Sequence, residues 1–191
     1  MAALRYLAGY PQPLVDKVQA LLARRQLHAS VTRRYPEAHA VRTDGALLEY
    51  VGDLKARYMR SAPPLAKVAY DNQLHVVHNA LGTHTAVSRV QGGQLKAKRE
   101  IRIASLFKEA PAAFLRMIVV HELAHLKERE HGKAFYALCE HMLPGYHQVE
   151  FDTRLYLTMR ALGARAPAVP GLRPDDGVST THPIAGAGSE T

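Results

Sequence analysis

The hydrophobic residues of this chain follow a helical spacing in some segments and a strand-like alternation in others. In residues 13–29 the apolar positions recur at helical intervals, and a second helix is predicted from Asp44 to Arg60, ended by Pro63 and Pro64. Short strands are then predicted at 66–70, 74–78, 83–90 and 94–103, with turn signals at 71–72 and 92–93. A helix entered from Pro111 follows, and two more are predicted at about 133–143 and 148–162. This order of elements predicts an α+β protein.

The length and composition predict one domain with tails. Of the 191 residues, 1–65 are expected to form an N-terminal helical extension, 66–163 the main domain and 164–191 a disordered tail. The tail is rich in Pro, Gly, Ser and Thr and has almost no bulky apolar residues. No apolar run approaches the roughly 20 residues of a membrane span, and no secretory signal is expected at the N-terminus. The single cysteine, Cys139, excludes an intrachain disulfide and favours a cytoplasmic location.

The stretch from His121 to His125 has the H-E-x-x-H spacing of a catalytic metal site. Residues four apart lie on the same face of a helix, so both imidazoles can bind one ion. Glu122 lies about 100° around the helix, within reach of a metal-bound water. Histidine suits Zn²⁺, and two histidines leave coordination positions open. The spacing therefore predicts one zinc ion per chain.

The alternative interpretation is a pair of core histidines bonded to carbonyl groups. In a helical projection His121 and His125 share a stripe with Phe114 and Ile118, so both rings are expected to be buried. A buried polar ring without a partner costs about 1–3 kcal/mol. A structural role for the histidines also leaves Glu122 near the interior without a purpose. The metal site is the better interpretation.

A third protein ligand is required, and His131 is the preferred candidate. A helix that ends near Glu130 and turns back would bring His131 to the metal. The His-x3-His-x5-His spacing equals that of metzincins, although Glu128 stands where those proteins have glycine. A carboxylate from a following helix, Glu140 or Glu150, remains the alternative.

The residues around this motif resemble a known family. Ile118-Val-Val-His-Glu-Leu-Ala-His-Leu126, followed by His131-Gly-Lys-Ala-Phe135, is similar to the signature of YgjP-like zinc metallohydrolases. The resemblance implies a zincin-like domain, in which a small, mostly antiparallel sheet packs on the H-E-x-x-H helix. It also implies His121, His125 and His131 as ligands and Glu122 as general base. Many relatives carry a Trp-Gly-Ser-Cys stretch where this chain has residues 89–93 and no tryptophan. SprT-like and WLM-type proteases share the pattern in looser form.

Positive charge is concentrated in the first half of the chain. Residues 1–100 hold 15 Lys and Arg against 7 Asp and Glu, whereas residues 101–191 hold 10 of each. Lys96, Lys98 and Glu100 are expected on one face of a strand, which favours a solvated sheet face. The alternative is a contact surface for nucleic acid or another polyanion.

These observations predict a zinc-dependent metallopeptidase that acts on polypeptides. Metal-activated water would attack the peptide bond, with Glu122 accepting its proton. Tyr136 or Tyr146 is a candidate donor to the developing oxyanion, and the spacing selects neither. A nucleoside triphosphate or phosphoester hydrolase is the alternative reaction. A DNA-associated SprT-like protease is a further alternative, and a non-catalytic, metal-stabilised binding module is the alternative of another class.

Overall fold

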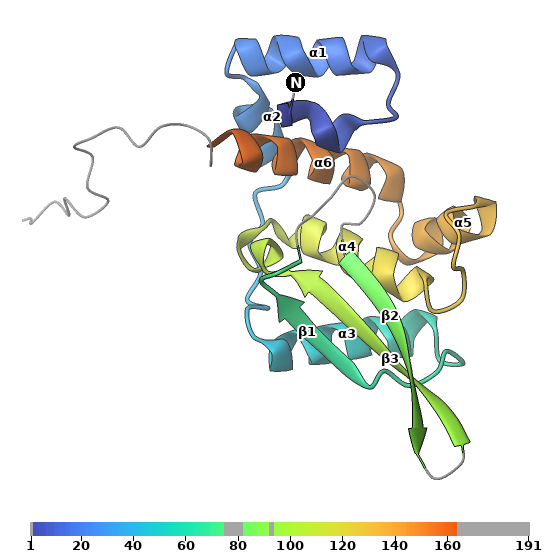
Figure 1. Cartoon of the computed structure of the whole chain (residues 1–191). Helices are drawn as coiled ribbons and strands as arrows, with labels where there is room; N and C mark the ends of the chain where they lie inside the picture. The colour runs from blue at the N-terminus through green and yellow to red at the C-terminus, as the bar shows by residue number, and fades with distance from the viewer. Residues whose placement is uncertain (1, 75–81, 92–93, 164–191) are drawn as a thin grey trace, which may run out of the picture.

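The computed structural model describes residues 2–74, 82–91 and 94–163 as a mixed α and β fold (Figure 1). Its elements follow in the order η1 (Ala2–Leu7), α1 (Gln12–Ala23), α2 (Leu27–Arg34), α3 (Asp44–Tyr58), β1 (Lys67–Asp71), β2 (Gly82–Gln91), β3 (Gln94–Ala104), η2 (Ser105–Glu109), α4 (Ala112–Ala124), α5 (Lys133–Met142) and α6 (Tyr146–Gly163). The α+β class predicted from the sequence is confirmed. None of the described helices is both long and apolar enough to span a membrane.

The sheet mixes parallel and antiparallel pairing. Its strand order is β1-β3-β2, with β2 antiparallel to β3 and β1 parallel to β3. The prediction of a mostly antiparallel sheet therefore holds for the β2–β3 pair but not for the β1–β3 pair, which is parallel. The reason is that β1 does not pair with the next strand in the chain, as consecutive strands usually do, but with β3. Most of the strand predicted at 74–78 and the turn predicted at 92–93 lie outside the described residues.

One face of β3 is buried and the other is polar. Ile101 and Ile103 are fully buried, whereas Glu100 and Arg102 alternate with them on the opposite face. The Arg102 guanidinium lies 3.0 Å from Asp71 and 3.5 Å from Glu100. In its described part, the outer face of β3 thus carries paired charges, as expected for a solvated face. The side chains of residues 96 and 98 lie outside the described set.

Helix α4 forms the centre of the fold. It lies between the sheet and α6, and it also contacts α3 and α5 (Figure 1). Its residues from Phe114 to Ala124 are buried with the exception of Arg116. A helix that is apolar on nearly all sides is stable only when it is enclosed by other elements, as α4 is by the sheet, η2, α3, α5 and α6. The H-E-x-x-H motif occupies the C-terminal end of this buried helix.

The N-terminal helices pack into the same hydrophobic core. Leu27, Val31, Leu47 and Val51 belong to one buried cluster with the apolar residues of α4. The helical run predicted at 13–29 is divided into α1 and α2, and Arg25 between them has a left-handed φ of 56°. The predicted division at residue 65 stays a prediction, and residues 164–191 lie outside the described part.

A buried carboxylate ties α2 to α6. Asp152 accepts hydrogen bonds at 2.8 Å from the Arg34 guanidinium and at 2.8 Å from the Tyr35 hydroxyl. Gln148 donates a third hydrogen bond to the same oxygen at 3.1 Å. These bonds satisfy a charge that would be costly to bury alone, and they hold the N-terminal helices against α6.

Candidate metal centre

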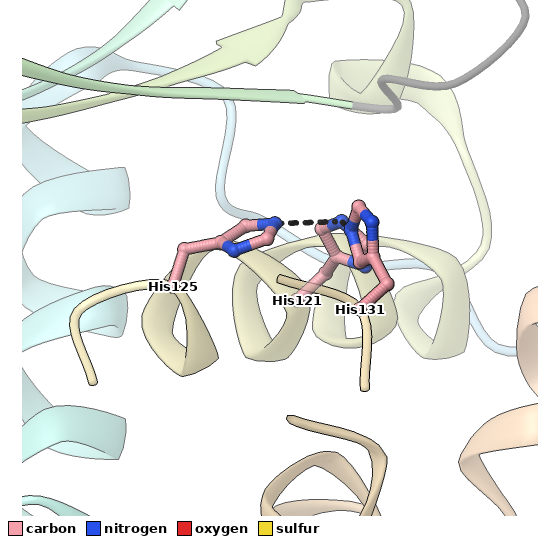
Figure 2. A group of neighbouring side chains, drawn as sticks. All are labelled: His121, His125 and His131. Carbon is pink, nitrogen blue, oxygen red and sulfur yellow. Dashed lines mark hydrogen bonds between the residues drawn. The ribbon is translucent and has the colours of Figure 1, made fainter. Parts of the chain in front are cut away.

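The structure brings the three predicted histidines together at the end of α4. The His121 Nε2 atom lies 3.3 Å from His125 Nε2 and 3.2 Å from His131 Nε2 (Figure 2). Zinc binds histidine nitrogen at about 2.0–2.1 Å in tetrahedral geometry, which places two ligand nitrogens roughly 3.3 Å apart. Among the described residues, these three form the only group of metal-ligand type that converges in this way. Their spacing fits one tetrahedral ion with an open position.

In His121 and His125, the ring nitrogen that faces away from the other histidines, Nδ1, forms a hydrogen bond. His125 Nδ1 lies 3.0 Å from the Glu128 carbonyl oxygen. A carbonyl only accepts, so Nδ1 of the neutral ring carries the hydrogen and Nε2 carries the lone pair. His121 Nδ1 is 2.7 Å from the Tyr146 hydroxyl. With these outer bonds in place, the nitrogens that face one another are available as metal ligands.

Burial keeps the innermost histidine neutral. The pKa of His121 is lowered to about 3, first by burial and then by the positive charge that His125 and His131 would carry. Burial also lowers the pKa of His125. Neutral imidazole is the form that binds a metal ion, so no proton has to be displaced from His121 near pH 7.

The metal helix ends earlier than the sequence predicted. Helix α4 ends at Ala124, with His125 as its C-cap, and the expectation that it continues to about Glu130 was wrong. The tight bond from the Lys127 amide to the Ala124 carbonyl closes the last turn. None of the described non-glycine residues in this turn has a positive φ. Glu128 therefore occupies the position where metzincins have glycine without backbone strain.

The two rival carboxylates have other partners. Glu140 accepts hydrogen bonds from the backbone amides of Gly145, at 2.8 Å, and His147, at 3.3 Å. Glu150 forms an ion pair with Arg154 at 2.8 Å. Neither carboxylate belongs to the histidine group. The geometry thus favours His131 as the third ligand, supplied by the segment that leads into α5.

Glu122 is buried beside the histidines with an unused oxygen. Its side chain is 1% exposed, and Oε2 has no hydrogen-bond partner among the described residues. Burial raises the pKa of this carboxyl to about 8. A buried carboxyl without a partner is costly for a fold and is typical of a catalytic acid or base. Glu122 and the three histidine nitrogens, which could bind a metal ion, together fit a hydrolytic metal centre.

Phe135 and Tyr146 support the histidines, and sequence reasoning missed both roles. The Phe135 ring centroid lies 5.0, 4.6 and 4.7 Å from those of His121, His125 and His131, respectively. The resemblance included Phe135 in its signature but indicated no contact. Tyr146 is fully buried and its hydroxyl bonds to His121, so it is not the free oxyanion donor that the sequence left open. No sequence signal pairs residues 25 positions apart.

Replacing Tyr146 by phenylalanine should weaken metal binding. The substitution removes only the hydroxyl that holds His121 Nδ1, and loss of such an outer partner costs about 10–100-fold in metal affinity. Competition with a chromophoric chelator measures the change. Tyr50→Phe, in α3 and outside the site, is the matched control and should leave the affinity unchanged. Equal affinities for the wild-type protein and Tyr146→Phe would contradict the assigned role.

The metal-free protein should become less stable as the pH rises from about 4.5 to 8. Because the pKa of Glu122 is raised from 4.5 to about 8, the folded chain keeps a proton that the unfolded chain releases in this range. The free energy of unfolding should therefore fall by at most about 1.4 kcal/mol per pH unit relative to Glu122→Gln. The two proteins share every other ionisable group, so the difference between their profiles isolates Glu122. Denaturant unfolding at several pH values measures it, and parallel profiles would contradict it.

Comparison with known proteins places this site in a recognised domain. The model of a family described as YgjP-like, metallopeptidase domain, matches residues 68–153, which include all three histidines and Glu122. The chain is 60% identical over 163 residues to the UTP pyrophosphatase of Escherichia coli strain K12, covering 85% of this chain and 98% of the relative. No solved structure gives a significant match.

Proposed function

The chain belongs to the YgjP-like family and is a metal-dependent hydrolase, and from this premise we propose that it cleaves a nucleoside triphosphate such as UTP and releases pyrophosphate. The observation that carries the proposal is the similarity to UTP pyrophosphatase, which extends over nearly the whole relative. The family resemblance inferred from the motif is confirmed. Peptide hydrolysis, the first expectation from the sequence, becomes the second candidate.

The residues of the site supply the groups that this reaction needs. A bound metal ion would act as a Lewis acid and lower the pKa of water toward neutrality. Glu122 accepts a proton from the attacking water, whose oxygen bonds to the α-phosphorus. The bond from this phosphorus to the bridging oxygen breaks, and pyrophosphate leaves with the electron pair. The proton held by Glu122 then passes to solvent or to the products.

Zinc is the metal that we propose. Three neutral imidazole nitrogens with an open position are typical of catalytic zinc sites. Mn²⁺ and Co²⁺ also bind imidazole, but sites for Mn²⁺ are usually richer in carboxylate oxygen. The two candidate carboxylates of α5 and α6, Glu140 and Glu150, are engaged elsewhere. The ligand set therefore supports Zn²⁺, with one ion per chain.

Charge and compartment agree with a nucleotide substrate. The excess of positive charge in residues 1–100 favours a polyanion, either the triphosphate itself or a nucleic acid. We propose a cytoplasmic location, because the only cysteine leaves no intrachain disulfide to form and nucleotides are plentiful in that compartment.

The second candidate is peptide hydrolysis. It is favoured by one structural observation, the position of β2 at the sheet edge in contact with α4. Strands of the sheet pass above the three imidazoles (Figure 2). A free strand edge beside a metal site can add an extended peptide to the sheet. The same site would then act on a carbonyl carbon instead of a phosphorus atom.

A parallel assay decides between these reactions. The zinc-loaded protein is offered UTP and an unfolded casein-type protein under the same conditions, and pyrophosphate and new peptide ends are measured. We expect pyrophosphate from UTP. Cleavage of the polypeptide without pyrophosphate release would overturn the proposal in favour of the second candidate. Failure of both reactions in the zinc-loaded protein would leave the chain as a binding module.

A further inference from the structure

A row of polar rings leads away from the histidine group along α5 and the start of α6. The Tyr136 ring lies 6.4 Å from the His131 ring and 4.9 Å from the His147 ring, measured between centroids. Tyr136 is partly exposed, and His131 and His147 are exposed. The row therefore begins at a metal ligand and continues at the surface, where a substrate has access.

The polar groups of Tyr136 and His147 have no structural role that the described residues reveal. In contrast to the Tyr146 hydroxyl, which His121 engages, the Tyr136 hydroxyl has no hydrogen-bond partner among them. His147 is held through its backbone amide, which bonds to Glu140, and its ring nitrogens also lack a partner in the described part of the chain. Both side chains are thus free to bind a ligand.

The two carboxylates near this row, Glu150 and Glu140, are both engaged by hydrogen-bond donors. The pKa of the Tyr136 hydroxyl is raised first by burial and then by the negative charge of Glu150. However, Glu150 forms a part-buried ion pair with Arg154, whose guanidinium lies 2.8 Å away. The pair is neutral overall, so it repels an anion near Tyr136 only weakly, and the charge of Glu140 is partly offset by the amides of Gly145 and His147. A phenol hydroxyl and an imidazole N–H are both donors that suit phosphate oxygens.

We propose that Tyr136 and His147 bind the β- and γ-phosphates of the substrate, the part that leaves as pyrophosphate. This inference rests on the proposed function, which places the α-phosphorus at the histidine group. The β- and γ-phosphates follow the α-phosphate directly, and Tyr136 next to His131, followed by His147 next to Tyr136, provides donors in the same order. The nucleobase is attached through the ribose on the other side of the α-phosphate. Tyr136 and His147 then stabilise charge on the leaving group, where it develops during the reaction.

Two substrates that differ only in the leaving group test this role. UTP and the p-nitrophenyl ester of UMP present the same α-phosphorus, but the ester lacks the diphosphate. In Tyr136→Phe and His147→Ala, the ratio of kcat/KM for UTP to kcat/KM for the ester should fall at least about tenfold, the effect of one hydrogen bond to a charged group. Tyr50→Phe and His141→Ala are matched controls away from the row and should keep the wild-type ratio. An unchanged ratio in both test variants would overturn the proposal.

Binding of pyrophosphate provides a readout that needs no turnover. Calorimetry with the zinc-loaded Glu122→Gln protein should show pyrophosphate affinity that falls at least about tenfold when Tyr136→Phe or His147→Ala is added. Unchanged affinity in both combinations would overturn the diphosphate site. Failure of the wild-type protein to hydrolyse UTP would instead overturn the proposed function, while the binding experiment would still decide whether these residues hold a diphosphate. The circular dichroism spectrum of each variant controls for folding.

Discussion

Glutamine at position 122 should lower the turnover of UTP by about 10²–10⁴-fold, the contribution of a positioned general base. The amide has nearly the shape of the carboxyl but does not accept a proton from water at neutral pH. Glu122 is 1% exposed and one of its oxygens has no partner among the described residues, so no other described group competes for this oxygen. Steady-state release of pyrophosphate measures the loss.

Metal content separates a catalytic role of Glu122 from a structural one. The Glu122→Gln variant should retain one zinc ion per chain, because the three histidine nitrogens remain. Its metal-free form should also be at least as stable as the wild type at pH 8, where the buried carboxyl is partly charged. Atomic absorption and thermal unfolding provide these controls. Full turnover by a zinc-loaded Glu122→Gln protein would remove Glu122 from the mechanism.

Alanine at position 131 should abolish stable metal binding and, with it, hydrolysis. His131 Nε2 is 3.2 Å from His121 Nε2, and its loss leaves only two protein ligands. The affinity should fall by more than the roughly 10–100-fold that loss of an outer partner costs. Because His131 is exposed, the fold should change little in stability. Metal content after dialysis and the midpoint of thermal unfolding measure the two effects.

His141→Ala is the matched control for this substitution. His141 is also an exposed histidine, at the end of α5, and its ring packs edge-on against Tyr58 at 5.7 Å. It should keep its zinc and its activity. A His131→Ala protein that retains zinc would show that the third ligand is another group, and Glu140 and Glu150 would return as candidates. A protein that loses both zinc and its fold would indicate that the metal is structural.

The elements of the chain were predictable where the hydrophobic pattern was long and regular. The α3 helix begins at Asp44 as expected, and Thr43 caps it through a hydrogen bond from the Ala46 amide. The strands predicted at 66–70, 83–90 and 94–103 and the helices predicted at 133–143 and 148–162 match the observed ones within a few residues, whereas the run at 13–29 is divided into α1 and α2. The end of α4 was misjudged, because the polar run from Lys127 to Glu130 is compatible with a helix and nothing local requires the turn.

The sequence by itself determined the local chemistry of this protein. The H-E-x-x-H spacing sets two histidines on one helical face, and that depends only on the helical period. The apolar run around the motif determined that this helix is buried, because its side chains cannot be left in water. The candidate ligands and base thus followed from positions close together in the chain.

Only the tertiary structure decided what surrounds that motif. The packing of α5 and α6 against α4 decides the approach of His131, the contact of the Phe135 ring with the three imidazoles and the bond between the Tyr146 hydroxyl and His121. The parallel pairing of β1 with β3 likewise joins segments separated by about 30 residues of chain. Contacts of this kind depend on the packing of the whole core, to which residues far apart in the chain contribute. No short stretch of sequence encodes them.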